Sequence, residues 1–334
     1  MRTILFVGLL AAAVALQAQP RYVPVELTVT SDFRGLSVVD DQVAWVSGSK
    51  GHVGKSVDGG KTWTFQQVAG YEKLDWRSLY GFDKDNAVIA NAGSPAVILR
   101  TTDGGATWKE VYRNEDKDAF FDGGDFWDAQ HGVMYGDPIG GKMLLMFTSD
   151  GGHTWSMATD AQRPALAEGE ASFAASGTGI RCVGKMLVVA TGGKVSRLWI
   201  SNDRGQTWTM RDIPIVQGTQ AAGIFSVAIN GRKWVVVGGD FQNDRKAPKQ
   251  AFYSTDGGKT WVESAETVGG WREGAEWIDK RTLLTTGPTG TEISGDGGRT
   301  WQSLFGANKL NVVRKARKGK LVVMAGSSRI GRLD

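Results

Sequence analysis

The chain has 334 residues, more than one ordinary hydrophobic core usually covers, so its length predicts either two domains or one large repeat architecture. It contains 46 Gly and 13 Trp but only 8 Pro, which indicates many tight turns beside large aromatic side chains rather than helices. A formal charge of +4 is too small to favour nucleic acid or an anionic membrane as a partner. Three His and one Cys exclude a Cys/His zinc site and a disulfide framework.

The first eighteen residues predict an export signal. Arg2 precedes an apolar stretch from Ile4 to Leu16, and Ala18 is a suitable last residue before cleavage. A bilayer span takes about 20 apolar residues, so a membrane anchor is the weaker interpretation. We expect residues 1–18 to be a signal peptide and residues 19–334 to form one exported domain, periplasmic or secreted, monomeric and not membrane-spanning. The lone Cys182 is expected to be a small buried residue rather than a nucleophile.

One eight-residue pattern, Ser/Thr-x-Asp-x-Gly-x-Thr-Trp, occurs six times at intervals of roughly 40 to 53 residues. Its Asp can accept backbone N–H groups of a turn, its Gly permits a positive φ, its Thr can bond the same loop, and its Trp begins the next strand. A calcium loop would need several more oxygen ligands, so we expect a structural turn and no metal. The Asp and Trp residues that recur in the six copies are Asp58, Asp103, Asp150, Asp203, Asp256, Asp296, Trp63, Trp108, Trp155, Trp208, Trp261 and Trp301.

The segments around these boxes predict the fold. Each box follows short apolar, β-rich segments and precedes another, such as residues 63–68, so each unit has the four strands of a propeller blade. After Trp301 the chain offers three more strands, at residues 311–314, 321–324 and 328–333, without a box. The alternating residues 22–30 best supply the missing strand, which would hide both sheet edges. We therefore predict an all-β, seven-bladed β-propeller whose last blade is closed by the N-terminal strand.

The repeat resembles the Asp-box, or BNR, repeat of sialidases and sortilin-type receptors. The fuller stretch from Trp45 to Ser56, which runs into the first box, is more similar to the photosystem II stability and assembly factor family and its bacterial relatives. This resemblance covers nearly the whole exported chain. It implies a non-catalytic assembly or stability factor without a cofactor, which binds a protein or peptide partner in the cell envelope.

Charged residues predict where a ligand would bind. In propellers, the loops that lead into each blade and the loops between second and third strands surround one mouth of the central channel, and the box turns lie on the opposite face. Two interpretations of the charges there stay open: mutually paired charges that close the channel, or a pocket in which three Arg bind carboxylates or an acidic peptide. The candidates are Arg34, Arg77, Asp122, Asp125, Asp137, Glu170, Asp240, Arg272 and Glu273.

The alternative function is a glycan-active enzyme at the same mouth. Sialidases, which the repeat resembles, use three Arg on the substrate carboxylate, a Tyr nucleophile paired with Glu, and an Asp acid/base. Arg34 is followed by Gly35-Leu36, which departs from that family, and Tyr135 is the one Tyr expected near the mouth, with no assignable Glu. Binding of a protein or peptide is therefore the principal expectation, with a glycan as the alternative ligand.

One basic run stands apart from these candidates. Residues 314–320 read Arg-Lys-Ala-Arg-Lys-Gly-Lys. Their simplest interpretation is a solvated hairpin turn between the first two strands of the last blade. The alternative is a docking patch for an acidic partner or for membrane headgroups.

Overall fold

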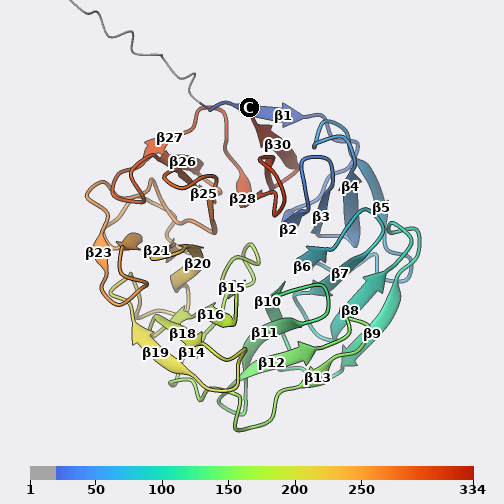
Figure 1. Cartoon of the computed structure of the whole chain (residues 1–334), viewed down its shortest axis with the longest axis horizontal. Helices are drawn as coiled ribbons and strands as arrows, with labels where there is room; N and C mark the ends of the chain where they lie inside the picture. Colours follow the sequence, from blue (N-terminus) through green and yellow to red (C-terminus); the bar gives the residue numbers. More distant parts are fainter. Residues whose placement is uncertain (1–19) are drawn as a thin grey trace, which may run out of the picture.

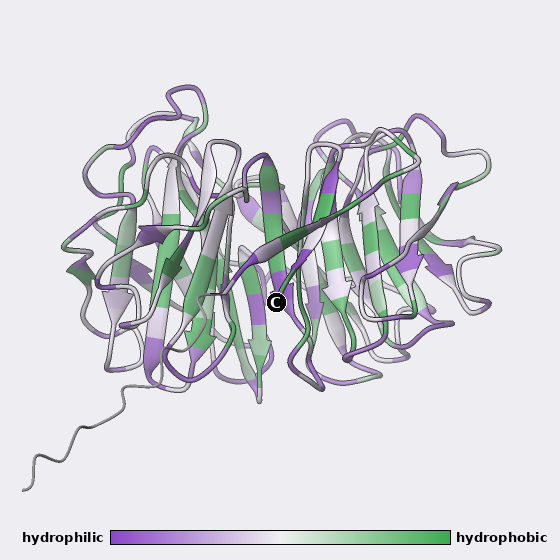
Figure 2. Cartoon of the chain, turned by 90° about the horizontal axis from the view of Figure 1, so that it is seen from above, coloured by the Kyte–Doolittle hydropathy of each residue, from purple (hydrophilic) through white to green (hydrophobic). Residues whose placement is uncertain are grey.

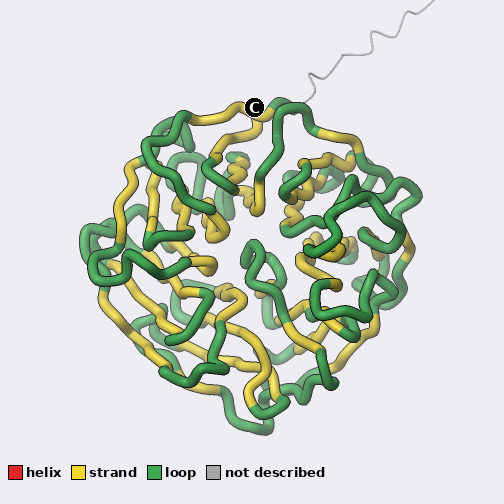
Figure 3. Tube along the Cα trace, turned by 180° about the vertical axis from the view of Figure 1, so that it is seen from behind, coloured by secondary structure: helices red, strands yellow, loops and turns green. Residues whose placement is uncertain are grey.

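The computed structural model describes residues 20–334, which form a closed ring of seven antiparallel sheets, six of four strands and one of six, around a central channel (Figure 1). Strands and connecting loops make up the ring (Figure 3). The predicted all-β, seven-bladed propeller is therefore confirmed. The proposed signal peptide lies outside the described residues. Within residues 20–334 there is no helix of the length and apolarity that a membrane crossing needs.

The first three blades follow the chain without interruption. Blade 1 consists of β2 (Phe33–Val38), β3 (Ala44–Gly48), β4 (His52–Ser56) and β5 (Thr64–Gln67). Blade 2 consists of β6 (Trp76–Gly81), β7 (Ala87–Asn91), β8 (Ala96–Thr101) and β9 (Lys109–Asn114). Blade 3 consists of β10 (Phe121–Phe126), β11 (Gly132–Ile139), β12 (Lys142–Thr148) and β13 (Ser156–Met157).

The next three blades include one irregularity. Blade 4 consists of β15 (Ile180–Val183), β16 (Met186–Ala190), β18 (Arg197–Ser201) and β19 (Thr209–Asp212). Two short strands, β14 (Glu170–Ala171) and β17 (Gly192–Gly193), extend blade 5, whose own strands are β20 (Ala222–Asn230), β21 (Lys233–Asp240), β22 (Ala251–Ser254) and β23 (Val262–Glu263). Blade 6 consists of β24 (Gly274–Trp277), β25 (Leu283–Gly287), β26 (Gly290–Ser294) and β27 (Gln302–Ser303).

Blade 7 closes the ring with both ends of the chain. It contains β28 (Leu310–Lys315), β29 (Val322–Gly326), β30 (Arg329–Leu333) and, as its outer strand, β1 (Tyr22–Val25). Tyr22 pairs with Leu333 and Val25 with Ile330, so the N-terminal segment supplies the missing strand as expected. The strand is shorter than the predicted residues 22–30, because after Val25 the chain turns toward blade 1. Leu27 and Val29 then pack at the interface between blades 7 and 1.

The hydrophobic core consists of seven layers, one between each pair of neighbouring blades. Alternate residues of a middle strand point to opposite faces, as strand geometry requires: Ile89 packs toward blade 1, whereas Val88 packs toward blade 3. The layer between blades 7 and 1 makes the ring continuous. Figure 2 shows the apolar residues along the strands and the hydrophilic ones mostly in the loops.

The six boxes form nearly identical turns at one end of the blades. In the first, Asp58 Oδ1 accepts the Thr62 N–H at 3.0 Å and its Oδ2 accepts the Thr62 hydroxyl at 2.6 Å. Gly59 and Gly60 both have positive φ, 76° and 75°. A positive φ was expected at the fifth position of the box, which is Gly60. The fourth position also has a positive φ, and in box 4 it is occupied by Arg204, with φ of 59°. Trp155 and Trp301 are buried, and the other box Trp are half-buried.

Loss of one box carboxylate should lower the stability of the ring modestly. Low pH should protonate the Asp carboxylates of all the boxes and so lower the stability further. The hydrogen bonds from the Thr62 hydroxyl and backbone lower the pKa of Asp58 to about 2. The stability from such a depressed pKa is present above the ordinary Asp pKa and is lost as pH falls through about 2. We expect Asp58→Asn to lower Tm by ~2–4 °C at neutral pH, measured by calorimetry. Asp85→Asn, which removes only a surface pair with Lys84, should leave Tm nearly unchanged.

Candidate functional site

The two ends of the channel differ in charge and access. We call the end where the inner strands begin the upper mouth, and the end where they finish, on the side of the box turns, the lower mouth. The upper mouth is formed by the first residues of β2, β6 and β10 and by Glu273 before β24. The lower mouth is formed by the last residues of the same inner strands and by the β28–β29 hairpin.

A β-bulge near the start of several inner strands turns charged side chains into the upper mouth. The register shifts between Phe33 and Gly35, between Trp76 and Ser78, and between Phe121 and Gly123. The residue in between is Arg34, Arg77 or Asp122, while the aromatic residue before it is buried in the blade. A bulge redirects one side chain in this way. The recurring aromatic–polar pairs in the sequence are therefore the signature of these bulges.

A segment of blade 4 fills the upper mouth. Residues 174–178, which we call the plug, precede β15 and reach into the centre of the ring (Figure 1). The carbonyl oxygens of Ala175 and Gly177 accept hydrogen bonds from Arg34 Nη1 at 3.0 Å and Arg314 Nη2 at 2.9 Å. The Ser176 hydroxyl donates to the Glu273 carbonyl at 2.6 Å. Blades 1, 6 and 7 thus hold the plug, and its residues are buried.

Blade 2 completes this arrangement, and acidic side chains outnumber basic ones around it. Arg77 Nη1 donates to the Ala174 carbonyl at 3.3 Å and its Nε lies 2.7 Å from Asp75 Oδ2. Arg34 Nη1 lies 2.5 Å from Glu273 Oε2. Burial raises the pKa of Glu273 to about 8, although Arg34 opposes that shift. Arg34 and Arg77 are therefore bound to carbonyl and carboxylate groups of the protein itself. This arrangement agrees with the interpretation in which mutually paired charges close the channel.

The structure brings five of the nine predicted site residues to this mouth. Arg34, Arg77 and Glu273 surround the plug. The buried Asp122 and the half-buried Asp137 lie at the same end of blade 3, because Phe121 pairs with Gly136 and the Asp137 N–H donates to the Phe120 carbonyl. Binding of a ligand by any of these residues stays a prediction.

The other four predicted residues do not share that position. Asp125 lies at the opposite end of β10, where its Oδ2 accepts the Cys182 N–H at 2.8 Å. Arg272 is buried inside blade 6, with its Nη2 2.5 Å from Glu292 Oε1, so that Glu273 takes the channel position beside it. Asp240 is the last residue of β21, where its Oδ1 accepts the Gln242 N–H at 2.9 Å.

Glu170, which was predicted to face the mouth, is instead buried in the segment that leads into blade 4. It lies on β14, where its carboxylate accepts hydrogen bonds from Trp199 Nε1 at 2.8 Å and from the Thr191 hydroxyl at 2.7 Å. Arg197 pairs with it at 3.0 Å. The inner strand of blade 4 begins only at Ile180, because the plug occupies the residues before it.

The lower mouth is a cavity of about 240 Å³ lined by side chains from all seven blades. Its charged residues are Arg181, Arg314, Lys315 and Arg317, against Asp125 and Glu276. Four basic groups face two acidic ones, so this end of the channel carries a positive charge. Low-dielectric walls concentrate such a field at an opening.

The basic groups of the lower mouth are held at different depths. Arg181 donates to the carbonyls of Val227 and Ala275, each at 2.7 Å, and its Nη2 lies 3.3 Å from Glu276 Oε2. Arg314 extends up the channel to the plug and lies 3.6 Å from the same carboxylate oxygen. These two guanidinium groups therefore share Glu276.

The outer groups of this mouth are more accessible. The Arg317 guanidinium stacks over the Tyr80 ring, 4.3 Å from its centroid. The half-buried side chain of Lys315 lines the same cavity and has no hydrogen-bond or ion-pair partner within residues 20–334. A cation without a partner at an open, positive mouth is available to an external anion.

The sequence pattern did not identify the basic residues of the lower mouth as site residues. Residues 317–320 do form the exposed turn of the β28–β29 hairpin, as predicted. Arg314 and Lys315, however, belong to β28, and Arg314 lines the channel. Arg181 was visible only as a neighbour of Cys182. In β28, four buried residues are followed by the half-buried Arg314 and Lys315, and this charged end of an apolar strand was the available signal. No group of three or more His, Cys, Asp or Glu in the described chain has the arrangement of a metal site.

The comparisons with known proteins agree with this architecture. The family model described as photosynthesis system II assembly factor YCF48 matches residues 14–120, and the BNR/Asp-box repeat model matches residues 252–263. The structure titled "YCF48 bound to D1 peptide" has a TM-score of 0.63 at 15% identity, covering 93% of this chain and 96% of that one. YCF48 from Cyanidioschyzon merolae has a TM-score of 0.67 at 14% identity, with 93% and 98% covered.

A polysaccharide-degrading enzyme shares the fold as well. The GH74 xyloglucanase from Xanthomonas campestris has a TM-score of 0.62 at 14% identity and is covered over 53% of its length by 93% of this chain. None of the curated proteins compared with the chain matches it. Identities this low show a shared propeller fold and leave ligand and activity to the residues of the site.

Proposed function

We propose that this chain, an Asp-box β-propeller close to the YCF48-like factors, is a non-catalytic binding protein that holds an acidic, extended peptide segment of a protein partner at its lower mouth. Its role would be assembly or stabilisation of that partner. In keeping with the expected export signal, we place the protein in the cell envelope, periplasmic or secreted.

The observation that carries the proposal is the unpaired cation at an open, net-positive mouth. Lys315 has no internal partner, and Arg317 is exposed beside it on the aromatic face of Tyr80. Carboxylates bind well to such paired basic groups through charge-assisted hydrogen bonds. The related propeller titled as YCF48 bound to a D1 peptide supports a peptide as the class of ligand.

Both the arginine pocket at the upper mouth and a glycan-active enzyme fit the geometry less well. Arg34 and Arg77 donate to the plug and pair with acidic neighbours, so neither is free to hold a substrate carboxylate. Asp122, a candidate acid, is 1% exposed. These contacts support a closed upper mouth and a binding function at the lower one.

Reversal of the charge at position 315 should weaken binding of an acidic peptide strongly. The probe is a fluorescein-labelled peptide rich in Asp and Glu, and its control is the same peptide with Asn and Gln. We expect Lys315→Glu to raise Kd at least about tenfold, equivalent to ~1.4 kcal/mol, in fluorescence anisotropy. Binding to the wild-type chain should also weaken as salt increases, because salt screens exposed charges.

The matched control is Lys61→Glu. Lys61 is exposed on the first box turn, on the same face as the lower mouth but outside the cavity. If Lys61→Glu weakened binding as much as Lys315→Glu, only the net charge would matter and the proposed site would be wrong. Equal binding of the acidic and the neutral peptide would contradict the proposed ligand class.

A further inference from the structure

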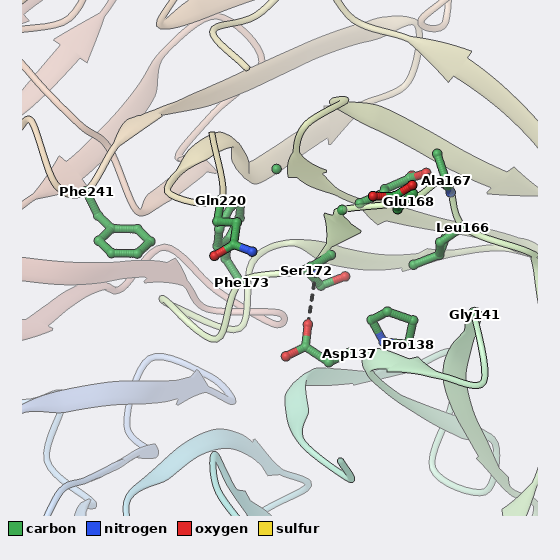
Figure 4. Close-up of a pocket in the computed structure, with 14 residues that line it drawn as sticks. Asp137, Pro138, Gly141, Leu166, Ala167, Glu168, Ser172, Phe173, Gln220 and Phe241 are labelled. Carbon is green, nitrogen blue, oxygen red and sulfur yellow. Dashed lines mark hydrogen bonds between the residues drawn. The ribbon is translucent and has the colours of Figure 1, made fainter. Parts of the chain in front are cut away.

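A second cavity, about 520 Å³ in volume, lies on the upper face beside the plug (Figure 4). We call it the upper groove. Asp137 at the upper end of β11 lies between two sets of side chains: Phe173, Gln220 and Phe241 on one side, and Pro138 and Leu166 on the other. Blades 3, 4 and 5 therefore all contribute to one surface, which is distinct from the lower mouth.

One wall of the upper groove is an aromatic cluster. Phe173 stacks on Phe225 with ring centroids 3.9 Å apart, and Phe241 meets each of these rings edge-on at 6.4 Å. Trp271 packs against both Phe225, at 5.2 Å, and Phe241, at 5.9 Å. Phe241 itself is 45% exposed. A large apolar ring that is held by the buried Phe225 and two half-buried aromatic neighbours, and is open to solvent, offers a ligand a preorganised surface.

The floor of the upper groove lacks positive charge. The residues that line it include Glu168 and Glu170, which pair with Lys194 and Arg197, but no basic residue. Asp137 has no ion-pair partner within residues 20–334, and its carboxylate accepts only the Ser172 N–H, at 3.4 Å. Carboxylates this enclosed are normally paired with a cation or fully hydrogen-bonded.

Two buried polar atoms near Asp137 have no hydrogen-bond partner within the described residues. Asp122 Oδ2 and Tyr135 Oη are buried without a hydrogen-bond partner in the described chain. Their side chains are 1% and 0% exposed. Tyr135 pairs with Gly123 across the β10–β11 ladder, so it lies next to Asp122 along β10 and two residues from Asp137 on β11. Two carboxyl groups and one hydroxyl meet here, and no basic side chain lines the adjoining groove, in contrast to the lower mouth.

We propose that the upper groove binds a basic side chain of an extended peptide, with the ammonium or guanidinium group on Asp137 and an adjacent apolar side chain on Phe241. Arg and Lys are donors without acceptors, so they complement the Asp137 carboxylate, which lines the groove and has no ion-pair partner among the described residues. A neutral sugar needs both donors and acceptors around its hydroxyls, and it fits this lining less well. The inference does not rest on the proposed function of the lower mouth.

The test uses two fluorescein-labelled peptides of the same length, in which Arg-Leu or citrulline-Leu is flanked by Gly and Ser. Citrulline keeps the shape of Arg and removes its charge. In fluorescence anisotropy at low salt, we expect the Arg peptide to bind the full chain at least about tenfold more tightly than the citrulline peptide. Asp137→Asn should abolish this preference, and Phe241→Ala should weaken binding of both peptides.

The control variants separate this site from the rest of the molecule. Asp118→Asn removes the same charge from an exposed loop of the upper face and should bind as the wild-type chain does. Lys315→Glu should also keep the preference for Arg, so failure at the lower mouth would leave this result intact. Equal binding of the two peptides, an unchanged preference in Asp137→Asn, or binding of cellotetraose without the Arg peptide would overturn the proposal.

Discussion

Removal of the closing strand should unfold the ring. A chain that begins at Ser31 lacks β1 and the apolar residues that follow it, so the edge of β30 becomes unpaired. Tyr22 is 6% exposed and packs between blades 6 and 7. Loss of one large buried side chain costs ~3–5 kcal/mol, and the whole free energy of unfolding of a typical domain is ~5–15 kcal/mol. We therefore expect no cooperative thermal transition near that of the full chain.

The control chain begins at Pro20 and keeps the strand, and it should melt as the full chain does. A synthetic peptide of residues 20–30, added in excess to the truncated chain, should restore the transition in proportion to its concentration, because it binds only the folded ring. Cooperative melting of the truncated chain within a few degrees of the control would show that six blades and three strands suffice, which would contradict the role of ring closure.

Replacement of Arg34 by Met should cause the largest loss of stability among single substitutions at the upper mouth. Glu273 has 0% side-chain exposure, and Arg34 is its ion-pair partner. Above about pH 8, where the Glu273 carboxyl is ionised, removing one partner of this buried ion pair should cost ~3–5 kcal/mol, because the other charge stays buried. The substitution also removes the hydrogen bond to the plug carbonyl of Ala175.

The size of this loss should depend on pH in a defined direction. Because the pKa of Glu273 is raised to about 8, its contribution to stability is fully present below the ordinary Glu pKa and is lost as pH rises through about 8. Without Arg34 the pKa should rise further, so the two chains should diverge most above about pH 8. We expect Arg34→Met to be more destabilising near pH ~9 than near pH ~6 in urea unfolding.

The double variant Arg34→Met/Glu273→Gln serves as the control. It has no buried carboxyl at this position, so it should recover most of the stability lost near pH ~9. An equal loss at both pH values, or a double variant no more stable than Arg34→Met, would show that Glu273 is not the cause.

The fold was predictable because it repeats. Each box contains its own hydrogen-bonding partners, so six local patterns predicted six turns without reference to the rest of the chain. The composite seventh blade followed from three strands without a box and one strand at the other end. The length of β1 was overestimated, because residues beyond Val25 alternate like a strand but pack between two blades instead.

The site was predictable only in part, because it depends on contacts between distant segments. Arg34, Arg77 and Asp122 follow a buried aromatic residue at a bulge, and this local signal placed them correctly at the channel. Nothing local indicates that residues 174–178 leave blade 4 and accept hydrogen bonds from blades 1, 2 and 7. The plug changes the function expected at that mouth, since it occupies the arginines, and the free cation lies at the other end, on Lys315.

The position of a bound acidic peptide tests the central claim most directly. A photo-cross-linking amino acid would be placed at Val183, which is 45% exposed and lines the lower mouth, and separately at Phe241 of the upper groove. The acidic peptide should cross-link to the chain carrying the label at Val183, and Lys315→Glu should abolish that product. Cross-linking from Phe241 in place of Val183, or a product at Val183 that survives Lys315→Glu, would contradict the proposal that the lower mouth binds the partner.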